Sequence, residues 1–309
     1  MAFQFQDQLL SKNGLAVIEI SRVFLSYELG QKLPTVTELS TSLDIPRGTV
    51  QNALKTLQAN DAVCFESRGH LGSYLTKKNT GILLQFAGIT SLVGAMPLPY
   101  SRKYEGMATG LISAMENSYD IPITLSYMRG ARNRIAMVLE GRYDFGILSK
   151  YAADEFIEKN PSISVIKEFG PKSYCSSHVV IFHDPKAAEI KDGMKVGIDS
   201  DSIDQESMTK QVCRGKKVTF IPVEYNSLLE RVMQGDLDAT VWNEDEIMDR
   251  SMKINCRRAF EENEDDTNAV IIVSKKEPEI GVILSKIIKP DEVLKIQKLV
   301  MDGKISPSY

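Results

Sequence analysis

Cysteine and histidine are scarce in this chain of 309 residues, which has four Cys and three His. The cysteines are dispersed along the chain, at Cys64, Cys175, Cys213 and Cys256. A zinc site or a redox motif needs cysteines or histidines at short, regular spacing, and the sequence has none. We therefore expect reduced thiols, no metal site and no cofactor.

Long hydrophobic runs are also missing. No apolar stretch reaches the roughly 18 residues that a membrane-spanning helix needs. The first residues, Met1 to Asp7, lack the basic region and apolar core of a signal peptide. With 43% hydrophobic and 25% charged residues, the composition is that of an ordinary globular protein, long enough for two or three domains. We expect a cytoplasmic protein that does not bind a membrane.

The sequence does contain an internal repeat. Gly141 is followed three residues later by Asp144, and Gly235 by Asp238, each time between a helical pattern and an apolar strand pattern. The two glycines are 94 residues apart (235 − 141). Glycine adopts the left-handed conformation that ends a helix, so each copy predicts a helix-to-strand junction. A repeat of this length predicts two similar α/β lobes, in which we expect the aspartates to form turns.

The N-terminal part has the pattern of a helix-turn-helix. Apolar residues at helical spacing predict a helix over about residues 13–29. Thr35 and Glu38 have the spacing of a capping box that opens a short second helix. Pro46 is expected at the first position of a third helix, which extends over about residues 47–60. A tight turn joins these last two helices, as in DNA-binding motifs.

Two strand patterns, residues 62–66 and 73–75, follow around a glycine-containing tip and predict a wing. At this point the stretch from Gly30 to Leu75 resembles the winged-helix domain of GntR-type bacterial transcription regulators. The motifs that carry the resemblance are Leu33-Pro34, Arg47-Gly48-Thr49-Val50 and Ala53-Leu54-Lys55-Thr56-Leu57. The resemblance implies an α+β winged helix-turn-helix domain over residues 1–78, whose third helix enters the major groove.

The resemblance also implies particular DNA contacts. Arg47, Gln51 and Asn52 would read base edges, because such side chains can pair with them. Contacts to phosphates or to the minor groove would come from Thr35, Thr49, Lys55, Arg68 and His70. The family has arginine at the positions of Gln51 and Thr37, so each monomer binds phosphates more weakly and we expect a homodimer on double-stranded DNA. A winged helix that binds another protein would explain the same polar positions.

From about Gly81 onward, strand and helix patterns alternate. In the first lobe, strands are predicted at residues 82–86, 92–96, 123–128 and 143–148, with helices reaching about residues 115 and 140. In the second lobe, strands are predicted at residues 179–182, 194–198, 218–223 and 239–242, with helices opening at a capping box of Ser202 and Gln205 and at Ser227. A return strand is predicted at residues 269–273. The pattern predicts mostly parallel sheets, with lobe I at about 80–150 and 268–309 and lobe II at about 175–267.

Two lobes joined by two crossings, with the strand Lys195-Val-Gly-Ile-Asp199, resemble the type II periplasmic-binding-protein fold. The chain as a whole is similar to YhfZ-type regulators. The strings that carry this similarity are Ala95-Met-Pro-Leu-Pro-Tyr100, Tyr104-Glu-Gly106, Met128-Arg-Gly-Ala131, Trp242-Asn243 and Pro307-Ser-Tyr309. The resemblance implies that residues 80–309 form a two-lobed α/β effector domain that closes on a small molecule.

In open α/β sheets, ligands bind in the crevice beyond the carboxyl ends of the strands. The residues expected there are Pro97, Tyr100, Ser101, Tyr104, Arg129, Arg132, Ser149, Asp199, Ser202, Asp204, Asn226, Trp242 and Asn243. Two helix N-termini and the charges of Arg129 and Arg132 favour an anionic or zwitterionic ligand. Asp199 and Asp204 would favour a positive or hydroxyl-rich end. Solvated arginines and ordinary aromatic packing are the alternative interpretation.

Catalysis would need a positioned nucleophile, acid or base. Asp199 and Asp204 could form an acid–base pair, and Cys175 with His178 could form a thiolate pair, but neither lies in a recognisable motif. Three residues apart on a strand, Cys175 and His178 would point to opposite faces. We therefore predict a ligand-responsive DNA-binding transcription regulator and no enzyme. The alternative is an enzyme or binding protein of the same two-lobed fold, with a winged helix that serves protein interaction.

Overall fold

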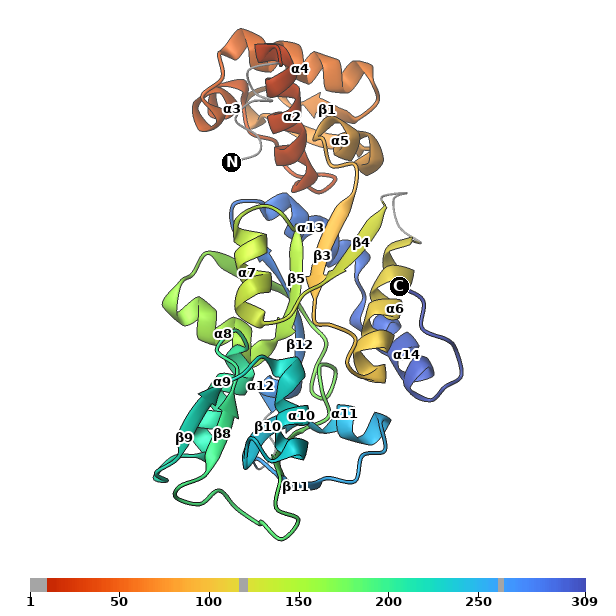
Figure 1. Ribbon diagram of the computed structural model, residues 1–309. Helices are drawn as coiled ribbons and strands as arrows, with labels where there is room; N and C mark the ends of the chain where they lie inside the picture. Colours follow the sequence, from red (N-terminus) through yellow and green to blue (C-terminus); the bar gives the residue numbers. More distant parts are fainter. Residues whose placement is uncertain (1–9, 117–121, 261–263) are drawn as a thin grey trace. The chain divides into compact units, whose positions relative to one another are not determined.

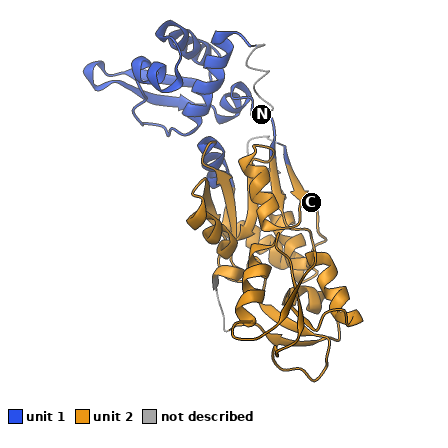
Figure 2. Ribbon diagram, turned by 60° about the vertical axis from the view of Figure 1, so that its left-hand side comes forward, with its two compact units in different colours: residues 1–92, 115–123, 277–287 blue, residues 93–114, 124–276, 288–309 orange. Residues whose placement is uncertain are grey.

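The computed structural model describes residues 10–116, 122–260 and 264–309 of the chain (Figure 1). The chain divides into two compact units, which Figure 2 shows in different colours. The first comprises residues 1–92, 115–123 and 277–287, and the second comprises residues 93–114, 124–276 and 288–309. Within the described residues, no helix is long and apolar enough to cross a membrane.

The first unit contains a winged helix-turn-helix. Its elements are α2 (Lys12–Leu25), α3 (Val36–Leu43), α4 (Arg47–Ala59), β1 (Val63–Ser67), η1 (Gly69–Leu71), β2 (Ser73–Lys78), α5 (Thr80–Phe86) and α13 (Pro278–Ile287). β1 and β2 pair antiparallel and form the wing. The capping box predicted for α3 is present: Thr35 Oγ1 accepts a hydrogen bond from Glu38 N at 3.2 Å, and the Glu38 carboxylate accepts one from Thr35 N at 2.7 Å.

Two details of this unit differ from the prediction. Pro46 is the N-cap of α4 and not its first helical residue. Residues 82–86, predicted as a strand, lie in helix α5, because Asn79 Oδ1 accepts a hydrogen bond from Ile82 N at 3.1 Å and opens a helix. Leu83 and Leu84 are buried in the helical conformation. A short apolar run fits a buried strand and a buried helix equally well, and the cap decides between them.

The second unit contains two α/β lobes. Lobe I has β3 (Leu92–Met96), α6 (Arg102–Glu116), β4 (Ile123–Tyr127), α7 (Ala131–Leu139), β5 (Phe145–Ser149), α8 (Lys150–Lys159), β6 (Ile163–Glu168), β12 (Ala269–Ser274) and α14 (Pro290–Met301). Lobe II has β7 (His178–Phe182), β8 (Lys195–Ile198), α9 (Ile203–Val212), β9 (Thr219–Pro222), α10 (Tyr225–Gln234), β10 (Ala239–Asn243), α11 (Glu244–Asp249) and β11 (Asn255–Arg258). The short helix α12 (Glu264–Thr267) packs on α8 and β5 of lobe I.

Each lobe is built on one five-stranded sheet, with strand order β4-β3-β5-β12-β6 in lobe I and β11-β7-β10-β8-β9 in lobe II. β3 runs parallel to β5, and β8 runs parallel to β9 and β10. The sheets are nevertheless mixed and not mostly parallel, because β12 runs antiparallel to both its neighbours and so does β7. β12 is buried along its whole length and forms the centre of the lobe I core.

The repeat recognised in the sequence forms the same junction in both lobes. Gly141 and Gly235 end their helices in the left-handed region, with φ of 67° and 85°. Asp144 N donates to Val93 O at 2.8 Å, and Asp144 Oδ2 accepts from Val93 N at 2.6 Å. Asp238 makes the same two bonds to Lys195, at 2.9 and 2.7 Å. Each aspartate thereby fixes the start of the neighbouring parallel strand, β3 or β8.

Candidate DNA-binding face and ligand cleft

Helix α4 presents the predicted DNA-reading residues to solvent. It buries Val50, Ala53 and Leu57 against the rest of the winged helix. The predicted contacts on its exposed surface are Arg47, Gln51, Asn52 and Lys55, and Thr49 is half-buried. α4 carries two cations and no acidic residue, so the helix itself does not repel a phosphate backbone.

The remaining predicted DNA contacts lie at the start of α3 and on the wing. Thr35 is exposed, and its hydroxyl caps α3. Arg68 lies 3.8 Å from Glu66, and its guanidinium stands 4.6 Å from the ring centroid of Tyr74. His70 is exposed in η1. The contacts inferred from the sequence therefore lie on three elements of one compact unit.

A cleft opens between the two lobes of the second unit. It encloses about 610 Å³ with its open mouth included. It is lined by Pro97, Leu98, Tyr100, Tyr104, Met128, Arg129, Gly130, Ala131, Arg134, Tyr174, His178, Ser202, Asp204, Gln205, Tyr225, Val241, Trp242 and Asn243. Eight of the residues predicted to bind ligand are among them, namely Pro97, Tyr100, Tyr104, Arg129, Ser202, Asp204, Trp242 and Asn243. The strand ends thus come together where the fold class predicts a ligand.

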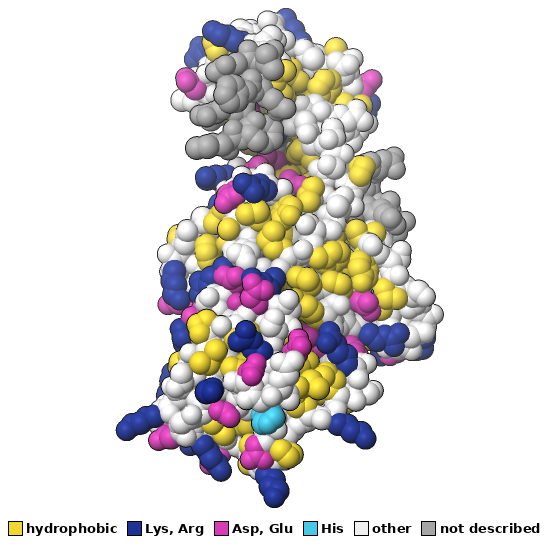
Figure 3. All heavy atoms as spheres, viewed as in Figure 1, with side chains coloured by type: hydrophobic (Ala, Val, Ile, Leu, Met, Phe, Trp, Pro, Cys, Tyr) yellow, Lys and Arg dark blue, Asp and Glu magenta, His cyan; other side chains and the backbone are white. Residues whose placement is uncertain are grey.

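Two predicted ligand residues outside the lining join the lobes directly. Arg132 donates from Nε to Ser200 O at 2.9 Å and from Nη2 to the Glu206 carboxylate at 3.0 Å. Ser149 Oγ donates to Asp204 Oδ1 at 2.7 Å. Burial raises the pKa of Asp204, and the bond from Ser149 opposes that rise. Basic and acidic side chains lie side by side on the face shown in Figure 3.

Arg129 both lines the cleft and bridges the two lobes. Its Nη2 lies 3.4 Å from Asp201 Oδ2, and its Nη1 lies 3.3 Å from Glu224 Oε2. Gly130, the next residue, has φ of 77°. It lies so close to Asp201 that a Cβ added to Gly130 would stand 2.8 Å from the backbone oxygen of Asp201. Lobe I therefore rests on lobe II at this edge of the cleft.

The other predicted ligand residues outside the lining organise the backbone or face solvent. Ser101 Oγ accepts a hydrogen bond from Tyr104 N at 3.4 Å. The Asp199 carboxylate accepts bonds from Asp201 N and from Tyr225 N, both at 3.0 Å. Asn226 is exposed on α10.

The capping box predicted at the start of α9 forms only in half. Ser202 Oγ accepts a hydrogen bond from Gln205 N at 3.4 Å. Gln205 turns away from the cap: its Oε1 accepts from Asp199 N at 2.7 Å, and its Nε2 donates to Thr240 Oγ1 at 2.9 Å. Gln205 therefore ties α9 to the ends of β8 and β10, a long-range role that local spacing does not reveal.

One wall of the cleft is aromatic. The rings of Tyr225 and Trp242 stack with centroids 4.1 Å apart and planes 9° apart. Tyr100 stands 5.5 Å from Tyr225, from the opposite lobe. Tyr104 and Tyr174 meet edge to face at 5.2 Å. The wall offers an apolar surface to the body of a ligand.

Several lining residues were not predicted from the sequence, above all Arg134. This side chain is 3% exposed. It donates from Nε to Ile147 O at 3.1 Å, from Nη1 to Met128 O at 2.8 Å and from Nη2 to Tyr174 Oη at 3.2 Å. Its position three residues into α7 could have suggested a role beside Arg129 and Arg132, but only the packing shows that it points inward.

Cys175 and His178 lie in contact, so the prediction that they point to opposite faces was wrong. Cys175 Sγ lies 3.7 and 3.8 Å from the two ring nitrogens of His178. Strand β7 begins only at His178, so strand alternation does not apply to Cys175. His178 Nδ1 lies 3.3 Å from Asp266 Oδ2.

The chemistry of this pair is not that of an exposed nucleophile. Burial raises the pKa of Cys175, which has no exposed surface, and His178 opposes that rise. Burial alone would lower the pKa of His178, but Cys175 and Asp266 outweigh it and the pKa is raised. Among the described residues, no group of three or more His, Cys, Asp or Glu side chains is placed to hold a metal ion.

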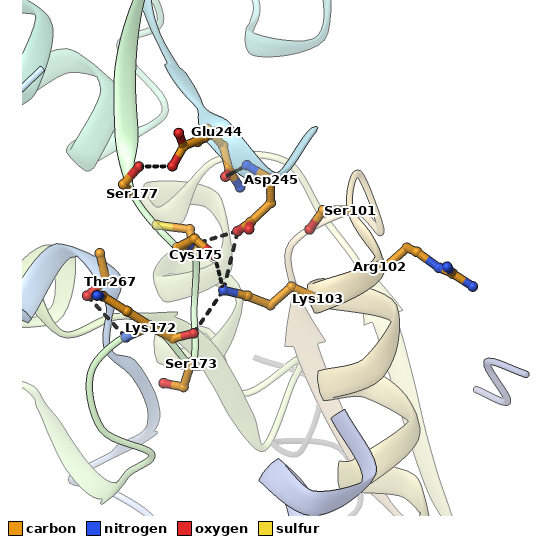
Figure 4. A network of polar contacts seen from close by, with 12 residues as sticks. Ser101, Arg102, Lys103, Lys172, Ser173, Cys175, Ser177, Glu244, Asp245 and Thr267 are labelled. Atoms are coloured by element: carbon orange, nitrogen blue, oxygen red, sulfur yellow. Dashed lines mark hydrogen bonds and ion pairs between the residues drawn. The ribbon is translucent and has the colours of Figure 1, made fainter. Parts of the chain in front are cut away.

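A buried lysine fixes the first crossing between the lobes, residues 169–177, as Figure 4 shows. Lys103 of α6 donates to Lys172 O at 3.0 Å and to Ser176 Oγ at 2.5 Å, and it lies 3.6 Å from Asp245 Oδ2 of α11. Ser177 in the same crossing donates to the Glu244 carboxylate. The first crossing is therefore held from both lobes by charged hydrogen bonds.

Comparison with known proteins agrees with this architecture. Residues 79–309 match the YhfZ C-terminal domain family. The chain belongs to the YhfZ family. Residues 28–75 match a helix-turn-helix domain family. The chain is 31% identical to YhfZ of Escherichia coli (strain K12) over 303 residues, which cover 97% of this chain and 98% of that protein.

The solved structure of another YhfZ protein is similar to this chain. The crystal structure of YhfZ from Shigella flexneri matches with a TM-score of 0.61 and 31% identity, covering 74% of this chain and 97% of that one. A periplasmic substrate-binding protein of an ABC transporter from Coxiella burnetii is similar at a TM-score of 0.49 and 13% identity, over 70% of this chain and 100% of that one. The chain thus combines a helix-turn-helix domain with a YhfZ-type domain of two α/β lobes.

Proposed function

We propose that this protein is a cytoplasmic, ligand-responsive transcription regulator that binds double-stranded operator DNA as a homodimer and a small anionic or zwitterionic molecule between its α/β lobes. The observation that carries the proposal is the combination in one chain of two features: an acid-free α4 with exposed Arg47 and Lys55, and a cleft between two lobes. A protein that only transports or transforms a metabolite has no use for the first feature. The YhfZ family membership supports the pairing.

On the DNA side, α4 would lie in the major groove with Arg47, Gln51 and Asn52 at base edges. Lys55, Thr35 and the wing would contact the backbone. Two cations on α4 supply few phosphate contacts for one monomer, so useful affinity requires two copies on paired half-sites.

On the ligand side, the bridges from Arg129 and Arg132 to lobe II connect the state of the cleft to the arrangement of the lobes. A ligand that changes these bridges shifts the equilibrium between lobe arrangements, by no more than its difference in affinity for them. In a dimer, that shift would change the spacing of the two recognition helices.

The test has two arms. In the first, the full-length chain is melted against a library of anionic metabolites, amino acids and sugar phosphates. A ligand at about 100 times its dissociation constant adds roughly 2.7 kcal/mol, a rise of several degrees. Arg129→Ala should remove the shift and leave DNA binding intact.

In the second arm, the protein selects its site from a pool of random duplexes. Arg47→Ala should lose sequence preference and keep weak, salt-sensitive binding. Failure of the wild type to enrich any sequence would contradict DNA recognition, whatever the melting arm shows. Turnover of a library compound by the protein would instead favour an enzyme.

A further inference from the structure

The cleft contains buried hydrogen-bond donors that no described residue satisfies. Trp242 and Asn243 are each 2% exposed, and neither the indole Nε1 of Trp242 nor Asn243 Nδ2 has a hydrogen-bond partner in the part of the chain that the structure describes. Both residues line the cleft at the end of β10. A buried donor without a partner costs roughly 1–3 kcal/mol, so two adjacent ones mark a place where an acceptor binds.

The orientation of the Asn243 amide is fixed by its neighbours. Its Oδ1 accepts a hydrogen bond from Asp245 N at 2.9 Å and caps α11. A backbone N–H can only donate, so the oxygen must face Asp245 and the NH₂ group must face away from it. Asn243 therefore presents a donor, not an acceptor, toward its remaining surroundings.

Arg134 supplies a positive charge to the lining of the cleft. Its three hydrogen bonds go to two backbone carbonyls and a phenol, all neutral, and no described carboxylate pairs with it. A guanidinium has five N–H donors, so about two remain after these bonds. Asp204 is near enough to interact electrostatically with Arg134 but does not hydrogen-bond to it, so an anion in the cleft would add a direct partner for this buried cation.

The other cations of the lining already have partners. Arg129 lies beside Asp201 and Glu224, and His178 lies beside Asp266. Asp204 adds a further carboxyl group to the lining. Three cations, Arg129, Arg134 and His178, thus stand against four carboxyl groups, Asp201, Glu224, Asp266 and Asp204, so the cleft suits a single negative charge better than the two of a phosphate monoester.

We propose that the cleft binds a small monocarboxylate, with Arg134 providing the positive charge, Asn243 and Trp242 donating hydrogen bonds to the ligand, and the rings of Tyr100 and Tyr225 covering its apolar body. This inference rests on the proposed function and narrows its ligand class. A carboxylate has about four lone-pair sites, enough for the donors of Arg134, Asn243 and Trp242.

The experiment uses the full-length chain and matched probes. Short-chain and aromatic monocarboxylates are compared with their primary carboxamides and with the corresponding phosphates, by thermal melting and calorimetry. The carboxylates should raise the melting temperature, and the amides and phosphates should not. Because Arg134 also holds the backbone of β5, the test variants are made at the neutral donors.

Asn243→Asp keeps the oxygen that caps α11, removes the donor and adds a negative charge. The variant should therefore bind the carboxylate about tenfold or more weakly than the wild type. Trp242→Phe keeps a ring for Tyr225 to stack on and removes one donor, so it should lower the affinity for the carboxylate by about three- to tenfold. Asn160→Asp, at an exposed position of lobe I, adds the same charge and should change nothing.

Several results would overturn the inference. Phosphates that bind better than carboxylates, carboxylates that bind Asn243→Asp as well as wild type, or no shift with any probe would each do so. If the metabolite library yields a ligand without a carboxylate, the inference fails and the proposed function stands. If neither the library nor the probes give a ligand, both fail.

Discussion

The phenol of Tyr225 donates a hydrogen bond to Oε1 of Glu246, at 2.9 Å. Tyr225 lines the ligand cleft, whereas Glu246 is 1% exposed in α11 and its second carboxylate oxygen has no hydrogen-bond partner among the described residues. Burial raises the pKa of Glu246 from 4.5 to about 7, although the bond from Tyr225 opposes the rise. An aromatic wall of the cleft is thus attached to a carboxyl group that titrates near neutrality.

This pair predicts how stability depends on pH. Between pH 4.5 and 7 the folded protein keeps a proton on Glu246 that the unfolded chain has lost. The free energy of unfolding should therefore fall as pH rises through this window, by about 3 kcal/mol from this group. Urea unfolding at pH 5 and pH 8 measures it. Glu246→Gln should flatten the dependence, while Glu158→Gln, at an exposed position, should leave it as in the wild type.

The two aspartate junctions predict equal and additive losses. Asp144→Ala and Asp238→Ala each remove a charged acceptor from a strand N–H, at a cost of about 1–2 kcal/mol in the free energy of unfolding. The sites lie in different lobes, so the double variant should lose the sum. Asp236→Ala, in the exposed turn beside Asp238, is the matched control for denaturant unfolding. A marked loss in the control would mean that the turn itself, and not the aspartate bond, carries the stability.

Glycines in two helices should respond to alanine with opposite sign. A Cβ on Gly110 of α6 would lie 2.6 Å from Val293 O of α14, so Gly110→Ala should destabilise the protein by about 1–3 kcal/mol. A Cβ on Gly48 of α4 would meet no atom of the described residues within 4 Å, so Gly48→Ala should stabilise the winged helix by about 0.5–1 kcal/mol. Calorimetric melting of the two variants checks both signs. Equal effects would refute the close packing of α6 on α14.

We expect Lys55 to contribute to the salt dependence of DNA binding. Its side chain is exposed on α4, so Lys55→Ala should weaken binding to all duplexes about equally. The slope of log affinity against log salt should become shallower by about one for each lost phosphate contact. Fluorescence anisotropy over a range of salt concentrations measures the slope. Lys159→Ala removes an exposed lysine from lobe I and should leave the slope as it is.

Much of the fold followed from local patterns in the sequence. Thr35 and Glu38 placed α3, and the spacing of apolar residues placed α4, because caps and helical periodicity act within a few residues. The repeated Gly-x-x-Asp indicated both lobes, since a left-handed glycine followed by a strand is a local event. The elements α8, β6 and α11 were not foreseen from the sequence.

Contacts between distant residues were decided only by the tertiary structure. Arg132 and Ser149 looked like ligand residues from their place at strand ends, yet they bond across the lobes to Glu206 and Asp204. Arg134 showed no signal in the sequence, yet packing turns it into the cleft.

The sequence by itself determined the helix-turn-helix, the two lobes and the class of side chains near the cleft, because periodicity, caps and turns depend on neighbours along the chain. The tertiary structure decided which charges are paired. Whether Arg129 or Arg134 keeps an uncompensated charge depends on carboxylates that lie about 70 to 95 positions further along the chain, such as Asp201 and Glu224. Only folding brings such groups within the few ångströms over which hydrogen bonds and ion pairs act.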